Sequence, residues 1–182
     1  MSLVCSVLWL IANVLVVTGP PATMTLFFYS SRAANGELTD FGDLWHKFKR
    51  SFGAGWRWGF INLLVMAALI GDIALTGQLS WAQSTIRYTQ GLYVALILVW
   101  TQIQLYALAF LQVQEEPRVR TAWRNGAVLL GRNILFSILT GIPTLLILLA
   151  GIPLFMLTAF FGPVLVAGIA THAVIDKVGI PE

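Results

Sequence analysis

Long apolar stretches separated by short polar segments make up most of the chain. Residues 1–31, 88–114 and 133–175 contain no Asp, Glu, Lys or Arg. A helix needs about 20 apolar residues to cross a hydrocarbon core about 30 Å thick, so stretches of this length are typical of membrane-spanning helices. The last stretch is too long for one crossing and suits two. The pattern predicts a single all-α, polytopic transmembrane domain over residues 1–182. Its five predicted spans are residues 3–31, 58–77, 88–112, 134–150 and 154–175.

The first predicted span contains a break at Thr18-Gly19-Pro20-Pro21. Proline lacks a backbone N–H and disfavours helical backbone in the residue before it. We therefore expect one helix that is kinked at these residues. Its freed carbonyls need partners from Thr18 or from neighbouring helices, because unpaired backbone groups are costly in lipid.

Two polar segments between predicted spans have the spacing of amphipathic helices. In residues 40–53 apolar and mainly aromatic side chains recur at helical intervals, and basic side chains fill the other face. Residues 118–131 repeat the basic amphipathic pattern, with Val119, Trp123, Ala127 and Leu130 as the apolar positions. Basic amphipathic helices lie at the lipid headgroups. The residues that we expect to face the membrane surface or a partner are Trp45, Lys47, Lys49, Arg50, Arg118, Arg120, Trp123 and Arg124.

The distribution of basic residues predicts the orientation. Nine of the 11 Lys and Arg residues lie in the segments that join spans one to two and three to four, whereas the opposite loops contain only Arg87. Loops rich in Lys and Arg stay in the cytoplasm. We expect a multi-pass protein with its N-terminus outside and its C-terminus in the cytoplasm.

Composition agrees with a membrane protein and excludes several other classes. Charged residues make up 10% of the chain, against roughly 25% in soluble domains. The single cysteine, Cys5, excludes an intramolecular disulfide and a multi-thiolate metal site. A net charge of +3 without a long basic run gives no indication of a nucleic-acid partner. No nucleotide-binding loop, metalloprotease motif or nucleophile elbow is present, so we expect no enzyme, no cofactor and no metal.

Few polar residues fall inside the predicted spans. Asp72 is the only acidic residue among them, and an acid within a span is a functional candidate. It lies near the outer end, where it could instead reach interfacial water or Arg87. Gln102 and Gln104 could form interhelical hydrogen bonds or line a polar cleft. Asp72, Gln102 and Gln104 are therefore the candidate substrate- or ion-binding residues.

His172 and Asp176 form a further polar pair, four residues apart and on one face of a helix. This spacing would suit a proton relay or two metal ligands. No convincing third and fourth ligand accompanies the pair, and polar residues are ordinary at the end of a span. Whether the pair has a function stays open.

The N-terminal third resembles the YesL-like family of bacterial membrane proteins. The resemblance covers residues 7–65, through LWLIANVLVVTGPPATMTLFFY and DFGDLWHKFKRSFGAGWRWGFINLL. The matching residues are Thr18, Gly19, Pro20 and Ala22, with Pro21 inserted, and Phe41, Phe48, Lys49 and Phe52. The resemblance implies a small protein of the cytoplasmic membrane with about five spans and no established activity. Some members lie beside genes for carbohydrate uptake, which implies an accessory role near sugar transport.

These observations favour a non-enzymatic accessory or structural protein of the bacterial inner membrane. It would contact the lipid bilayer and, through its amphipathic helices, a protein partner or a second copy of itself. The alternative is a small transporter or channel-like protein with a site near the broken first helix, because broken helices often border binding sites. A membrane-embedded enzyme that uses His172 and Asp176 is the third possibility.

Overall fold

The fold is a set of helices in which one long hairpin extends away from the rest. A computed structural model describes residues 2–14, 17–79, 82–114, 118–150 and 155–178, and these ranges contain helices and no strands. The helices are α1 (Ser2–Val14), α2 (Gly19–Ala34), α3 (Phe41–Arg50), α4 (Phe52–Thr76), α5 (Gln83–Val113), α6 (Val119–Arg132), α7 (Ile134–Ala150) and α8 (Phe155–Val178). The predicted all-α class is confirmed over the described ranges.

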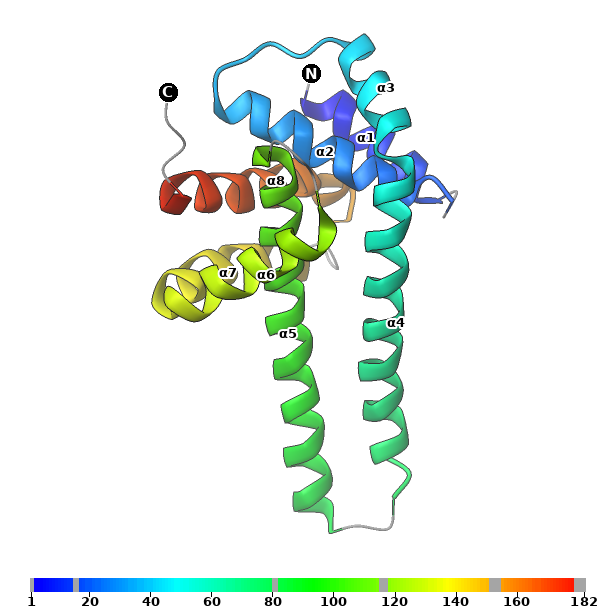
Figure 1. Ribbon diagram of the computed structural model, residues 1–182. Coiled ribbons are helices and arrows are strands. Elements are labelled where there is room, and N and C mark those ends of the chain that lie inside the picture. The colour runs from blue at the N-terminus through cyan, green and yellow to red at the C-terminus, as the bar shows by residue number, and fades with distance from the viewer. Residues whose placement is uncertain (1, 15–16, 80–81, 115–117, 151–154, 179–182) are drawn as a thin grey trace.

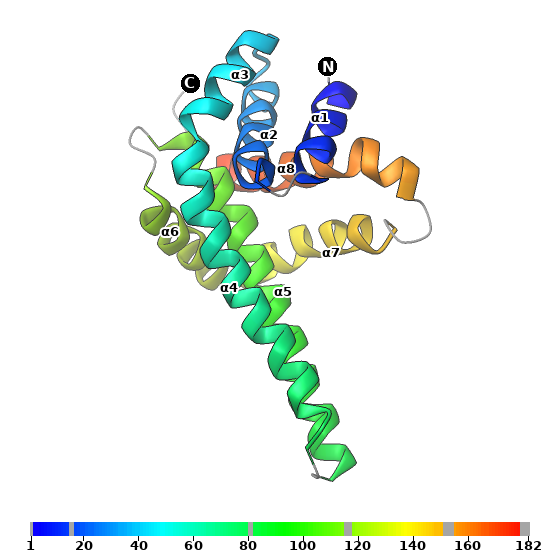
Figure 2. The same ribbon diagram turned by 90° about the vertical axis from the view of Figure 1, so that its right-hand side faces the viewer.

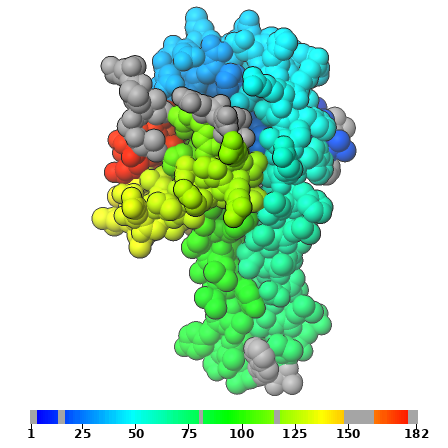
Figure 3. Space-filling view, viewed as in Figure 1, coloured from blue at the N-terminus to red at the C-terminus, as the bar shows by residue number. Residues whose placement is uncertain are grey.

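Helices α4 and α5 form the long hairpin. Figures 1 and 2 show its far half standing clear of the other helices, and the space-filling view in Figure 3 shows the same projection. Trp58 hydrogen-bonds to Gln104, and Asn62 hydrogen-bonds to Trp100. Residue numbers increase along α4 as those of their partners decrease along α5, so the two helices are antiparallel. The predicted spans 58–77 and 88–112 correspond to these two helices.

The prediction of five spans is wrong for the described part of the chain. Only α4 and α5 are long and apolar enough to cross a membrane, or three spans if the bent pair of α6 and α7 counts as one. That pair turns by 107° between Arg132 and Ile134, and α7 and α8 lie across the axis of the long hairpin in both ribbon views. The length of a charge-free stretch indicates how long an apolar helix can be, but it does not indicate the direction in which that helix runs. The start of the predicted span 154–175 lies outside the described residues.

The predicted kinked span over residues 3–31 is also wrong, because the chain reverses direction there. Helices α1 and α2 run antiparallel, side by side (Figure 2). Trp9 Nε1 donates to Thr23 Oγ1 at 3.0 Å, which holds the two arms together. Pro20 and Pro21 lie in the first turn of α2, where a missing N–H costs nothing and the fixed φ favours a new helix. The two prolines therefore start a second helix instead of bending the first.

The freed carbonyls at this turn find the partners that the sequence analysis expected. The Thr18 hydroxyl donates to the Ala12 carbonyl at 2.6 Å. Trp56 Nε1, from α4, donates to the Val17 carbonyl at 2.8 Å. One partner is thus local and the other comes from a neighbouring helix.

The prolines that begin α2 pack directly against two glycines of α4. A Cβ atom placed on Gly55 would lie 2.8 Å from Pro21 N, and one on Gly59 would lie 2.7 Å from Pro20 Cγ. Both distances are shorter than van der Waals contact. The absence of side chains at Gly55 and Gly59 therefore allows α2 to approach the backbone of α4, as small residues do between membrane helices.

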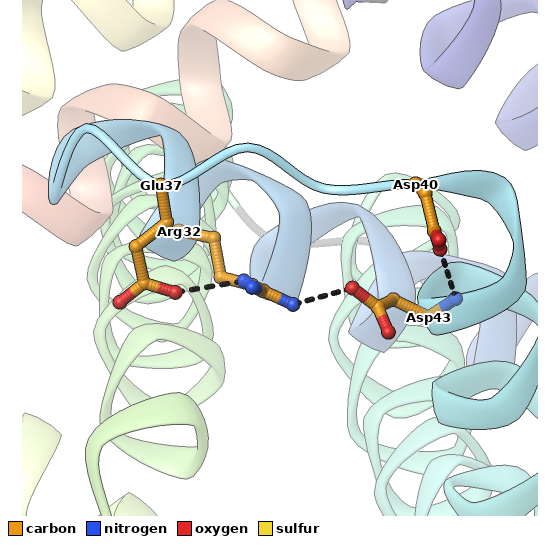
Figure 4. Close-up of polar contacts among 4 residues, drawn as sticks. All are labelled: Arg32, Glu37, Asp40 and Asp43. Carbon is orange, nitrogen blue, oxygen red and sulfur yellow. Dashed lines mark hydrogen bonds and ion pairs between the residues drawn. The ribbon is translucent and has the colours of Figure 1, made fainter.

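The connection between α2 and α3 is held by charged side chains. Asp40 caps α3 by accepting a hydrogen bond from the Asp43 backbone N–H at 2.8 Å. Arg32, in the last turn of α2, donates to Glu37 at 2.8 Å and to Asp43 at 2.7 Å (Figure 4). These contacts fix the direction in which the amphipathic helix α3 leaves the α1–α2 hairpin.

Candidate functional site

Gln104 lies at a buried junction of three helices. Its Oε1 accepts hydrogen bonds from Trp58 Nε1 of α4 at 2.6 Å and from Trp123 Nε1 of α6 at 2.8 Å. The Gln104 side chain is buried, and its Nε2 has no hydrogen-bond partner among the described residues. Of the two roles that the sequence left open for Gln104, the structure shows interhelical hydrogen bonding.

Trp123 lies deeper between helices than a residue at the membrane surface would. Its half-buried ring packs 6.2 Å from the ring of Trp100, in addition to bonding Gln104. Helix α6 folds back along α5, and Gly126 allows this because a Cβ there would lie 3.0 Å from the Ile103 carbonyl. Trp123 therefore joins helices, and this junction occupies the face that was expected to meet lipid or a partner.

A second set of polar contacts joins α5 to α7. Gln102 Nε2 donates to Thr140 Oγ1 at 3.3 Å, and the buried Tyr106 hydroxyl lies 2.7 Å from the same atom. Thr140 and Ser137 were not singled out from the sequence. Their only signal was a hydroxyl in an otherwise apolar stretch, and that signal does not identify a partner 34 residues away.

Asp72 stands apart from these contacts. It is half-buried and lies four residues before the end of α4 at Thr76, and Figure 1 shows that this end of the helix projects from the molecule. Within the described ranges its carboxylate makes no hydrogen bond or ion pair, and Arg87 does not reach it. Its backbone carbonyl accepts from the Thr76 hydroxyl at 2.6 Å. The structure thus leaves Asp72 as an isolated acid near the tip of the hairpin.

The candidate residues do not share a cavity. Thr18 borders a groove of about 320 Å³ between α1, α2 and α3. Gln102 borders a different groove, of about 410 Å³, between α5, α6 and α7. Asp72 borders neither of them. The described structure therefore does not bring Asp72, Gln102 and the helix break together as a transport site would require.

His172 and Asp176 border a third hollow, of about 770 Å³, between α2, α7 and α8. Both side chains are exposed, and the Asp176 carboxylate lies 3.7 Å from Lys177 Nζ. Among the described residues no group of three His, Cys, Asp or Glu side chains could hold a metal ion. The hollow that the pair borders is also lined by Ser30 and Thr140, but within the described ranges it has no third metal-ligating side chain.

The basic residues of α3 and α6 have different surroundings. Lys47 Nζ lies 5.0 Å from the centre of the Phe28 ring, and Lys49 Nζ lies 4.9 Å from that of Trp45. Burial lowers the pKa of Lys47, and the charge of Arg50 lowers it further. Of the basic residues predicted to face the membrane or a partner, Lys49, Arg50, Arg118, Arg120 and Arg124 are exposed. The two helices therefore present most of their predicted cations to their surroundings.

No family profile, curated protein or solved structure matches the chain. The resemblance of residues 7–65 to the YesL-like family therefore stays a prediction.

Proposed function

We propose that this chain is a non-enzymatic accessory or structural protein of a membrane. In this proposal the α4–α5 hairpin crosses the bilayer, and the basic helices α3 and α6 contact a partner complex on the cytoplasmic side. The observation that carries the proposal is the apolar surface of the hairpin. A bacterial inner membrane as the location, and a carbohydrate transport system as the partner, are what the resemblance to the YesL-like family adds.

The surface of the hairpin supports crossing of the bilayer. Only 6% of the most apolar 18-residue window of α4 is buried within the chain. Leu63 on α4 and Leu92 on α5 are each 60% exposed, and many of their apolar neighbours are similarly open. An apolar patch of this extent is unfavourable in water and marks contact with lipid or with another protein. At 1.5 Å per residue, the 25 residues of α4 extend about 37 Å, which exceeds the roughly 30 Å hydrocarbon core.

The use of the polar residues favours a structural role over transport. Gln102 and Gln104 bond to other helices, and so do Asn62 and Tyr106. A transport path needs polar groups that are free to bind a substrate, and these four are engaged in holding α4, α5, α6 and α7 together. Of the candidate substrate- or ion-binding residues, only Asp72 makes no side-chain bond within the described ranges, so it is the one that still supports the transporter alternative.

The reversal between α1 and α2 predicts the location of the N-terminus. Because α1 and α2 run antiparallel, the start of α1 lies beside the end of α2. The end of α2 leads into α3, so the start of α1 lies on the side of α3. With α3 facing the cytoplasm, the N-terminus lies in the cytoplasm, in contrast to the outside location expected from a single first span. A reporter that is active only in the cytoplasm, fused before Ser2, should be active. An active periplasmic reporter at the same point would show that residues 3–31 cross the membrane.

The accessory role predicts a partner that depends on the exposed cations of α6. The double variant Arg120→Glu/Arg124→Glu should lose co-purification of the partner from native membranes in mild detergent, because charge reversal opposes an acidic partner surface. Arg87→Glu, near the tip of the hairpin, is the matched control and should retain the partner. A wild-type chain that always migrates alone would contradict the proposal, whereas a complex containing only copies of this chain would identify a homo-oligomer.

A further inference from the structure

We propose that the groove between α1, α2 and α3 binds one acyl chain of an anionic phospholipid, with Lys49 at the lipid phosphate. This site rests on the proposed location in a membrane, but it goes beyond general contact with the bilayer. It assigns a particular lipid class to a particular cavity, through the residues that line the cavity and its edge.

The interior of the groove is apolar and aromatic. Its side walls are formed by Leu8, Trp9 and Ile11 of α1, Ala22 and Leu26 of α2, and Phe41, Trp45 and Phe48 of α3. The two threonine hydroxyls at the groove are already engaged, because Thr18 donates to the Ala12 carbonyl and Thr25 to the Pro21 carbonyl. These hydroxyl protons are therefore not available to a polar ligand, and an alkyl chain fits the lining. The volume of about 320 Å³ lies at the lower end of the roughly 300–1,000 Å³ range of small-molecule sites.

The groove is open where the apolar face of α3 borders it. Phe41 is 58% exposed and Trp45 is 50% exposed, although both line the cavity. Leu8 and Ile11 are also exposed on the opposite wall. An acyl chain could therefore enter from the side, and it would cover aromatic surface that the chain itself leaves open.

A positive charge stands at the edge of this opening. Lys49 Nζ lies 4.9 Å from the centre of the Trp45 ring, and that ring forms part of the groove wall. Arg32 is paired with Glu37 and Asp43, whereas within the described ranges neither Lys49 nor Arg50 makes an ion pair. Helices α1 and α2 contain no acidic residue, and the one acid within α3, Asp43, is bound to Arg32. Asp40, which caps the start of α3, bonds to the Asp43 backbone N–H. Within the described ranges no carboxylate therefore pairs with Lys49, and its charge complements the phosphate of an anionic lipid.

The test measures quenching of Trp45 fluorescence by lipids with brominated acyl chains. The purified full chain in detergent is titrated with brominated phosphatidylglycerol and, separately, with phosphatidylcholine that carries the same chains. We expect phosphatidylglycerol to quench at lower concentration. Trp45→Phe should reduce the quenched component, and Trp9, which also lines the groove, should account for the remainder. Lys49→Gln should weaken the apparent affinity for phosphatidylglycerol about fivefold, the effect of removing one cation near a lipid surface. The matched control Arg87→Gln should leave the affinity unchanged.

A variant that fills the groove distinguishes lipid bound in this site from lipid that contacts the protein surface in general. Ala12→Phe places a ring in the lining and should abolish the quenching of Trp45 by both lipids, while the melting temperature of the variant reports whether the fold is kept. Equal quenching by both lipids that is insensitive to Lys49→Gln and to Ala12→Phe would overturn the proposal. Displacement of the lipid by inorganic phosphate alone would also overturn it, because the acyl chain would then not determine binding.

If the chain is integral to membranes but shows no selective quenching, the groove assignment fails and the proposed function stands. A chain that is not integral to membranes would instead refute the proposed function.

Discussion

Replacing Gly55 by alanine should lower the free energy of unfolding by about 3 kcal/mol, the upper part of the range for overpacking a tight contact. The new Cβ would lie 2.8 Å from Pro21 N and 2.9 Å from Pro21 Cα. These atoms belong to a backbone whose φ angle is fixed by the proline ring, so they cannot move aside as the end of a flexible side chain can. For a chain of this size, a loss of 3 kcal/mol corresponds to a melting temperature about 6–12 °C lower.

Two glycines in the same helix provide matched controls for this prediction. A Cβ on Gly53 or on Gly71 would meet no atom within 4 Å. Gly53→Ala and Gly71→Ala should therefore leave the melting temperature unchanged or raise it slightly, since alanine favours helix by up to about 1 kcal/mol. Thermal unfolding of the three variants in one detergent measures the contrast. If Gly55→Ala unfolds at the wild-type temperature, the α1–α2 turn does not lie against α4 as described.

Replacing Gln104 by leucine should lower the free energy of unfolding by about 1–3 kcal/mol, the sum expected for two interhelical hydrogen bonds. Leucine keeps much of the volume but removes the Oε1 atom that accepts from Trp58 and Trp123. Both indole N–H groups would then remain in the interior without an acceptor. The loss should also loosen α6 from α5, which would be visible as faster hydrogen exchange of the α6 backbone amides.

Gln112→Leu is the control for this second prediction. Gln112 lies on the same helix, but its Nε2 donates to the Leu108 carbonyl within α5. Its replacement should change the free energy of unfolding by less than about 0.5 kcal/mol, as for sites away from buried networks. Equal destabilisation by Gln104→Leu and Gln112→Leu would show that the junction of Trp58, Gln104 and Trp123 does not join the helices.

The sequence predicts the long hairpin well and the remaining helices less well. Helices α4 and α5 each carry one apolar stretch of spanning length, which in α4 contains the single acid Asp72, so apolar length finds both of them. Residues 3–31 form an apolar stretch of similar length, but hydropathy does not distinguish a kink from a reversal. The deciding feature is local, because Pro20 and Pro21 both occupy the first turn of a new helix. The sequence does predict the break between α6 and α7, as a surface helix followed by a separate span. The direction of α7 escapes prediction, since it depends on packing against other helices such as α8.

The same division holds for the candidate residues. The expectation of interhelical hydrogen bonds at Gln104 follows from the cost of a bare amide within a span. Its partners, 46 and 19 residues away, depend on how α4 and α6 pack on α5. Trp123 illustrates the limit, because an aromatic residue on an amphipathic helix can face either lipid or another helix, and the pattern along the chain is the same in both cases. The groove beneath α3 is likewise a product of how α3 lies against the α1–α2 hairpin.

Cysteine labelling tests most directly whether the α4–α5 hairpin crosses the bilayer. Because Cys5 is the only cysteine, a Cys5→Ser background allows single cysteines at Gln78, in the tip of the hairpin, and at Asn35, between α2 and α3. If the hairpin crosses the bilayer as proposed, these positions lie on opposite sides of the membrane. A membrane-impermeant maleimide should label Gln78→Cys in intact cells and Asn35→Cys only after the membrane is made permeable. Labelling of both positions from the same side would contradict a membrane-crossing hairpin.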